Sequence, residues 1–146
     1  VYNLGDSSVA SLTGNASKAT AAINNSILGE SNTAAQDFTG LARNSGSNST
    51  SGTRNLVRST SGQSFTTTST SDPKLGVLAD NGGPTQTMLP ASDSPVINAG
   101  SNSVVAAKDQ RGVTRILHGT VDIGAVEVDY IAPNTSFIST PTDLTN

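Results

Sequence analysis

The amino-acid sequence predicts an all-β fold in which short strands stack as a solenoid, and three observations lead to this prediction. Apolar residues make up 34% of the 146-residue chain and aromatic residues 3%, both low for a globular domain. The chain has 21 serines, 19 threonines and 13 asparagines, so it can bury only a thin core. The apolar residues occur in short β-branched clusters without a sustained period of 3.6 residues. A solenoid fits all three, because polar residues occupy its turns and solvent face.

Charge and cysteine content argue against several classes of protein. Charged residues are 13% of the chain and the net charge is −3, which is too little charge for a disordered acidic tail. Without cysteine, no disulfide and no thiolate metal site can form. The acidic balance and the lack of a lysine and arginine cluster argue against nucleic-acid binding. The sequence has no run of about 18 apolar residues, so we expect no membrane span in this segment.

The first residues give the weakest signals. Residues 9–12 have the composition of a strand. Residues 16–22 would suit a helix by propensity, but Thr20 and Ile23 are β-branched and the neighbouring glycine and asparagines break helices, so we predict strand or coil. Residues 1–6 lack the methionine, basic region and apolar region of a signal peptide, and we expect the chain to be an excerpt of a longer precursor.

Residues 19–28 predict two short strands joined by a polar bend. We place the bend at Asn24 and Asn25, because asparagine tolerates the left-handed backbone conformation that such a bend needs. A third short strand is predicted over residues 37–40.

A second set of strands is predicted at residues 54–57 and 64–67. Aligning Ile27 with Leu56 gives an offset of 29 residues, which is longer than a minimal solenoid coil. We assign the excess to residues 44–53, which are rich in glycine, serine, asparagine and threonine and are predicted to protrude as a loop. The large apolar residues of both sets are expected inside: Ile23, Ile27, Leu28, Phe38, Leu56, Val57 and Phe65.

Four sequence blocks follow these strands in a fixed order. They are SDPKLGVLADNGGPTQT at 71–87, SPVINAG at 94–100, DQRG at 109–112 and VDIGAVE at 121–127. Together they resemble the segment that closes right-handed parallel β-helices in large bacterial surface and secreted proteins, often called a choice-of-anchor domain. The resemblance extends over residues 19–128. The chain departs from the family at Asn98, where members usually carry aspartate.

This resemblance implies a domain organisation. Residues 1–71 would be the terminal coils of a right-handed parallel β-helix, and residues 72–128 would be a closing segment that caps its open end. Residues 129–146 resemble a linker and the first strand of a bacterial immunoglobulin-like repeat, which is incomplete because a full sandwich needs about 100 residues. We expect the apolar residues within 133–146 to pack against another chain or against the side of the β-helix.

The Asp80 loop is the first candidate site. One carboxylate, the Asn81 amide and exposed carbonyls could bind a cation. However, calcium usually takes more than one carboxylate, so Asp72 would have to fold back. The Asn-Gly pair and the following Gly-Pro instead predict a tight turn.

The densest charge lies in the blocks at 109–112 and 121–127. An alternating strand would place Asp122 on the face opposite Ile123. Arg111 could bind Asp109, Asp122 or Glu127 through forked hydrogen bonds, forming a structural clasp. Alternatively, two carboxylates could act as acid and base on a glycan. That reaction needs a groove and usually aromatic platforms, whereas the chain has two tyrosines, three phenylalanines and no tryptophan.

For the remaining candidates, His118 and the Asn-x-Ser/Thr triplets, we predict no functional role. His118 is the sole histidine and lacks a second histidine or a cysteine as co-ligand, so we predict an exposed loop residue. Four Asn-x-Ser/Thr triplets are expected by chance in so serine- and threonine-rich a chain: Asn15, Asn24, Asn48 and Asn134. The sequence assigns no catalytic, cofactor-binding or metal-binding residue.

Three functions are consistent with these features. The favoured one is a non-catalytic structural or adhesive module, extracellular or at the cell surface, which joins a β-helix to immunoglobulin-like repeats. Its partners would be other domains of its own parent chain, copies of itself in a fibre or surface layer, or a glycan. The alternative is the C-terminal part of a β-helical polysaccharide lyase or glycoside hydrolase. The third is an adhesin or filament subunit that binds through exposed strands.

Overall fold

The structure of the chain is a computed structural model, and it describes residues 2–6, 18–29, 36–43, 45–62 and 67–130. The described residues form parallel β-strands and irregular loops, which confirms the all-β class. Their helix content is one turn of 3-10 helix, η1 (Asn102–Val104). The strands are β1 (Tyr2–Asp6), β2 (Lys18–Ala22), β3 (Ile27–Leu28), β4 (Phe38–Arg43), β5 (Ser47–Ser51), β6 (Asn55–Val57), β7 (Thr60–Gly62) and β8 (Thr67–Ser69).

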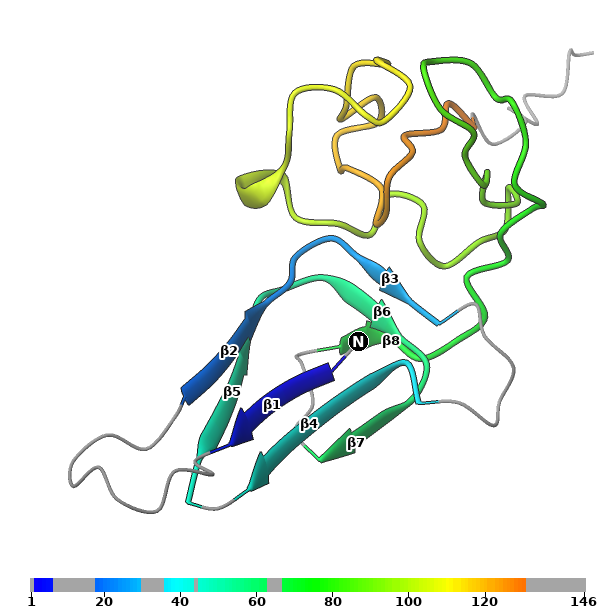
Figure 1. Cartoon of the computed structure of the whole chain (residues 1–146). Helices are drawn as coiled ribbons and strands as arrows, with labels where there is room; N and C mark the ends of the chain where they lie inside the picture. The colour runs from blue at the N-terminus through cyan, green and yellow to red at the C-terminus, as the bar shows by residue number, and fades with distance from the viewer. Residues whose placement is uncertain (1, 7–17, 30–35, 44, 63–66, 131–146) are drawn as a thin grey trace, which may run out of the picture.

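The chain passes through three parallel sheets in turn. Their strand orders are β1-β4-β7, β2-β5 and β3-β6-β8, so that consecutive strands up to β8 belong to different sheets. Figure 1 shows the three sheets arranged around a common interior. Lys18 pairs with Ser47 and Ile27 with Leu56, so two of the sheets share one offset of 29 residues. The sequence predicts the second of these pairings.

The bend between β2 and β3 lies beside a matching bend between β5 and β6. Asn25 and Arg54 occupy equivalent positions and both have positive φ, 47° and 55°. The fully buried Asn55 holds the first bend, because its Nδ2 donates to Ile23 O over 2.7 Å and its Oδ1 accepts from Ser26 N over 3.0 Å. The predicted bend is confirmed. Asn25 adopts the positive φ, and the side chain of Asn55 holds the backbone on both sides of the bend.

Strand β5 lies where the sequence predicts a protruding loop, over residues 44–53, and that prediction is wrong. β5 pairs with β2 along its whole length. Across this pair, Thr20 Oγ1 and Ser49 Oγ are 3.1 Å apart. The composition of the segment suggested turns, but hydroxyl side chains also suit a strand whose outer face is polar, because they can pair across the sheet.

Several predictions fall outside the described residues. These are the strand at 9–12, the core position Phe65, most of the strand at 64–67 and the packing of residues 133–146. Of the strand predicted at 64–67, only Thr67 is among the described residues, and it is the first residue of β8.

Adjacent residues of β3 and β6 point to opposite faces of their sheet, as strand geometry requires. The three sheets formed by β1–β8 together are called the strand stack. Leu28 and Val57 face its interior, where they pack with Phe38. Ile27 and Leu56 face outward and belong to a second apolar cluster. Six of the predicted core residues are buried or partly buried in these two clusters: Ile23, Ile27, Leu28, Phe38, Leu56 and Val57.

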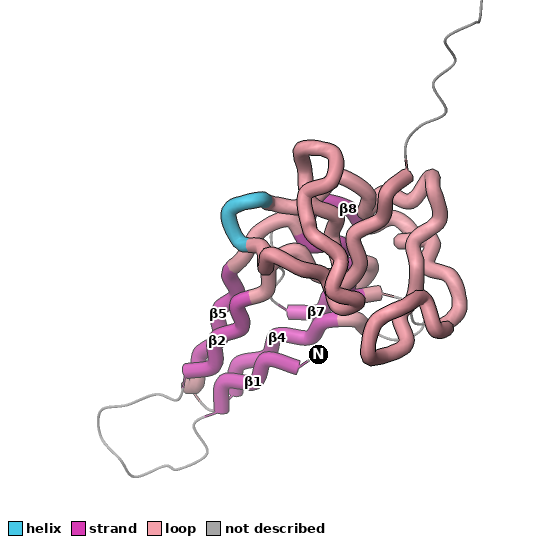
Figure 2. The backbone as a smooth tube through the Cα atoms, turned by 90° about the horizontal axis from the view of Figure 1, so that it is seen from above, coloured by secondary structure: helices cyan, strands magenta, loops and turns pink. Residues whose placement is uncertain are grey.

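The closing segment, residues 72–128, packs on the outer face of the β3-β6-β8 sheet. Val96 and Ile123 complete the outward cluster with Leu56, and Gly124 N donates to Asn25 O over 2.7 Å. In Figure 1 the yellow and orange loops lie over β3, and in Figure 2, seen from above, loops drawn in pink cover part of the strands. The contacts that the structure gives for this segment are therefore with the outer face of β3 and β6 and with the bend at Asn25. That the segment caps the open end of the strands stays a prediction. The apolar outward face of β3 and β6 accounts for this placement.

Candidate functional site

The loop that begins at Asp80 is a tight turn, as the sequence predicts. Asp80 Oδ1 accepts from Gly82 N over 3.1 Å, and Asn81 Nδ2 closes the turn by donating to Thr87 O over 2.7 Å. Asp72 accepts a hydrogen bond from the backbone N–H two residues further along and does not fold back toward Asp80. Among the described residues, no group of three or more histidine, cysteine or acidic side chains is placed to hold a metal ion.

The densest charge forms one buried group, which we call the carboxylate cluster: Asp109, Asp122, Glu127, Arg111 and Arg115. The three acidic residues are 7%, 1% and 1% exposed in that order. The structure thus brings together all the charged residues proposed for a clasp. It adds Arg115, which the sequence did not single out because it lies outside the four blocks.

Asp109 is bound through four hydrogen bonds. Its Oδ1 accepts from the backbone N–H groups of Arg111 and Val113 over 2.8 and 2.9 Å. Its Oδ2 accepts from Glu127 N and from Arg111 Nε, both over 3.0 Å. Arg111 Nη2 also donates to Glu127 O over 2.6 Å. The predicted clasp is confirmed: Arg111 joins the Asp109 loop to the last part of the closing segment.

The other two carboxylates also bind backbone. Asp122 accepts from Asn98 N over 2.7 Å and from Val128 N over 2.8 Å. Glu127 Oε1 accepts from Ile116 N, and its Oε2 accepts from Asp122 N, both over 3.0 Å. Three loops that lack regular secondary structure are held together in this way.

The alternation predicted for residues 121–127 is wrong. Val121, Asp122 and Ile123 are all buried, and this stretch is not a strand. A strand would have turned Asp122 away from the core. The irregular backbone instead lets the carboxylate turn inward, where unpaired N–H groups need an acceptor.

The geometry of the cluster suits a structural role. Each of the six carboxylate oxygens accepts at least one backbone N–H. A general acid must present a proton and a nucleophile must present a free oxygen to a bound substrate. Carboxylates whose oxygens are committed to backbone donors instead act as fixed acceptors that organise loops.

Burial and hydrogen bonding shift two pKa values in opposite directions. For Asp109, desolvation raises the pKa, but hydrogen bonds from the backbone of Glu127 and Val113 and from Arg111 outweigh it and hold the pKa below its ordinary value of 3.8. For Asp122, desolvation is the largest effect and the Glu127 charge adds to it. The pKa of Asp122 is therefore raised above 3.8 despite its two backbone donors.

We expect Asp109→Asn to weaken the dependence of stability on acidic pH. The folded pKa of Asp109 lies below 3.8, so its contribution to stability is present above that pH and is lost as the pH falls through the folded pKa. The pKa of Asp122 is raised, so its effect has the opposite sign. Its contribution to the stability of the fold is present below pH 3.8 and is lost as the pH rises through its folded pKa. Urea unfolding from about pH 6 to about pH 2 should show the gap between wild type and variant shrinking on acidification. A constant gap would contradict the assignment.

His118 is an exposed loop residue, as the sequence predicts, and two of the four glycosylation triplets lie among the described residues. His118 is exposed in a loop, with Nε2 2.7 Å from Asp129 Oδ1. Asn24 is exposed and its Oδ1 accepts from Thr53 N over 2.9 Å, whereas Asn48 is buried. The other two triplets lie outside the described residues: Asn15 and Asn134.

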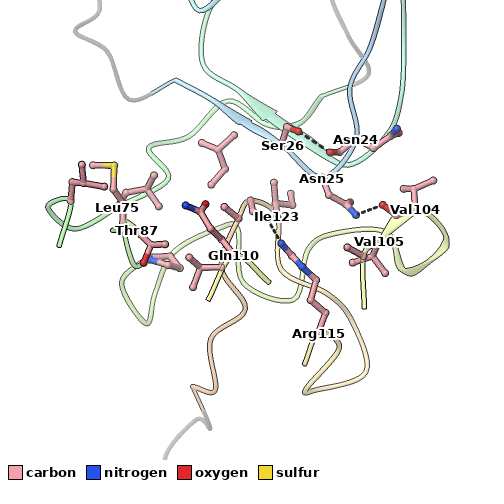
Figure 3. A pocket seen from close by; sticks show the side chains of 18 of the residues that line it. Asn24, Asn25, Ser26, Leu75, Thr87, Val104, Val105, Gln110, Arg115 and Ile123 are labelled. Atoms are coloured by element: carbon pink, nitrogen blue, oxygen red, sulfur yellow. Dashed lines mark hydrogen bonds between the residues drawn. The ribbon is translucent and has the colours of Figure 1, made fainter. Parts of the chain in front are cut away.

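An open pocket of about 620 Å³ lies between the strand stack and the closing segment. The bend at Asn24, Asn25 and Ser26 forms one wall, and loops of the closing segment form the others (Figure 3). Asn25 helps to join the two walls, because its Oδ1 accepts from Ser101 N over 2.7 Å. Sequence reasoning missed this pocket, since it forms where segments more than 70 residues apart meet.

Comparison with protein-family models, with curated proteins and with solved structures finds no significant match. In the part of the chain that the structure describes, no helix has the length and apolar character that a membrane crossing requires.

Proposed function

We propose that the chain is a non-catalytic structural and adhesive module of a large extracellular bacterial surface or fibre-forming protein. In this proposal, residues 1–71 are the terminal coils of a right-handed parallel β-helix and residues 72–128 brace their side. Residues 129–146 lead into an immunoglobulin-like repeat. The observation that carries the proposal is the carboxylate cluster, in which every carboxylate oxygen binds backbone N–H.

The order of the strands supports the β-helical part of the proposal. From β1 to β6 the chain visits the three sheets twice in the same order, and all named pairings are parallel. Stacked repeats of this kind bury a continuous thin core between neighbours, which suits a chain with few apolar residues. Phe38 and Val57 lie in such a core.

The position of the closing segment supports a bracing role. Ile27 and Leu56 would leave an apolar face on the outside of the β3-β6-β8 sheet, and such faces promote association with other proteins. Val96 and Ile123 cover that face in the structure. The carboxylate cluster then stabilises the covering loops, which contain few backbone ladders of their own.

The outer edges of β1 and β2 suit a further strand from a neighbouring coil of the parent protein. Within the described residues, no strand pairs with these edges. Free backbone groups on a sheet edge accept a further strand. We assign this position to a neighbouring coil of the parent protein, with homotypic assembly into a fibre as the other use of the same edge.

Arg111→Ala tests the structural assignment. The substitution removes charge-assisted hydrogen bonds to Asp109 and Glu127, so we expect the free energy of unfolding to fall by about 2–3 kcal/mol. We expect surface display of the parent protein, and any binding or enzymatic activity that it has, to stay unchanged when each is measured per folded molecule. Loss of an activity without loss of stability would show that the cluster is a functional site and would overturn the proposal.

A further inference from the structure

The pocket between the strand stack and the closing segment is lined mainly by apolar side chains. They come from β3 and from three loops of the closing segment: Ile27, Leu75, Leu78, Met88, Val104 and Val105. Leu78 is 58% exposed at this wall. Pockets that bind small molecules typically combine such an apolar lining with a few polar groups that orient the ligand.

Arg115 is the charged residue among those that line the pocket. Its side chain is 10% exposed and rises beside Ile123 in Figure 3. Its Nη2 donates to Gly124 O over 2.9 Å, and its Nη1 lies 3.9 Å from Glu127 Oε2. Within the described part of the chain, its buried Nε has no hydrogen-bond partner.

Arg111, the other arginine of the carboxylate cluster, serves as a comparison, because its Nε and its Nη2 both bind partners in the closing segment. Arg115 instead has one short hydrogen bond and one long ion pair, and it faces the pocket. An unpaired buried donor on a cationic group is costly. Because Nε is closed to solvent, a ligand acceptor would bind the Nη groups, whose contacts in the structure are one hydrogen bond and one ion pair at 3.9 Å.

We propose that this pocket binds a small amphipathic carboxylic acid, with its carboxylate on Arg115 and its aliphatic part against Ile27, Leu75 and Leu78. A guanidinium offers two parallel N–H donors that match a carboxylate. Glu127 Oε2 lies 3.9 Å from Arg115 Nη1 and does not line the pocket, so a ligand carboxylate would approach a different part of the guanidinium. This inference goes beyond the structural role, and its failure would leave that role intact.

Isothermal titration with octanoate tests the site, with octanamide as the neutral probe of equal length and acetate as the probe without an apolar part. We expect octanoate to bind at least about 10-fold more tightly than either. Octanamide loses a charge-assisted contact, which is worth about that much, and acetate loses the apolar surface that the pocket would bury. Arg115→Gln should abolish the preference for octanoate over octanamide.

A second pair of variants keeps the test valid if Arg115→Gln does not fold. Leu78→Ser should weaken octanoate binding by about 5-fold or more, since it removes apolar surface from the wall. Val77→Ser is the matched control, because Val77 is 82% exposed and does not line the pocket. The proposal is overturned if octanoate does not bind, if octanamide binds equally well, or if the two serine variants behave alike.

Discussion

Asp109→Ala is expected to lower the free energy of unfolding by about 3–5 kcal/mol, because it breaks a buried charge pair from one side. The substitution leaves three backbone N–H groups, those of Arg111, Val113 and Glu127, without their acceptor. It also leaves the Arg111 guanidinium, which is 14% exposed, without its carboxylate. Urea unfolding at neutral pH measures the loss.

Asp93→Ala is the matched control for this experiment. Asp93 also forms an ion pair, with Lys74 Nζ at 2.5 Å, but the side chains of Lys74 and Asp93 are 45% and 71% exposed. Ion pairs in water contribute little to stability, so this variant should unfold close to wild type. If Asp109→Ala were as mild as Asp93→Ala, the carboxylate cluster would not be what holds the closing segment together.

Gly52→Ala is expected to cost at least about 3 kcal/mol or to prevent folding, since it combines backbone strain with a steric clash. Gly52 has a φ of +122°, and a Cβ there would lie 1.7 Å from Ile23 O. That carbonyl accepts the hydrogen bond from the buried Asn55 Nδ2, so it cannot move away without disrupting the bend. Circular dichroism and urea unfolding give the result.

Gly82→Ala separates the two causes. Gly82 also has a positive φ, +87°, but a Cβ there would have no heavy atom within 4 Å. This variant should therefore show the backbone strain alone, about 1–2 kcal/mol. Equal losses in the two variants would mean that the close approach between neighbouring bends does not constrain the stack.

The features that the sequence predicts correctly depend on local chemistry. The bend at Asn24 and Asn25 follows from the backbone preference of asparagine, and the clasp follows from the spacing of Asp109 and Arg111. Both residues of the clasp lie in one turn, where an aspartate naturally accepts from the N–H two residues further along. The apolar positions of the strands were predictable for a similar reason, because each is a large side chain in a polar neighbourhood.

The features that the sequence could not predict depend on contacts between distant segments. Strand β5 is specified by its partner β2, and its serine-rich composition alone resembles a loop. The placement of the closing segment depends on Ile27 and Leu56 pointing outward, which requires the register of β3 with β6. Arg115 and the pocket emerge only once the closing segment lies on that face.

Native-state hydrogen exchange in an Ile123→Ala variant tests most directly whether the closing segment braces the strands. Ile123 is 1% exposed in the cluster that joins the two parts. The informative amides are Leu56 N, which donates to Ser26 O within the stack, and Glu127 N, which donates to Asp109 in the closing segment. If the two parts are one structural unit, the opening free energies of both amides should fall together, by about 2–4 kcal/mol. Loss of protection at Glu127 with Leu56 protected as in wild type would contradict the bracing role.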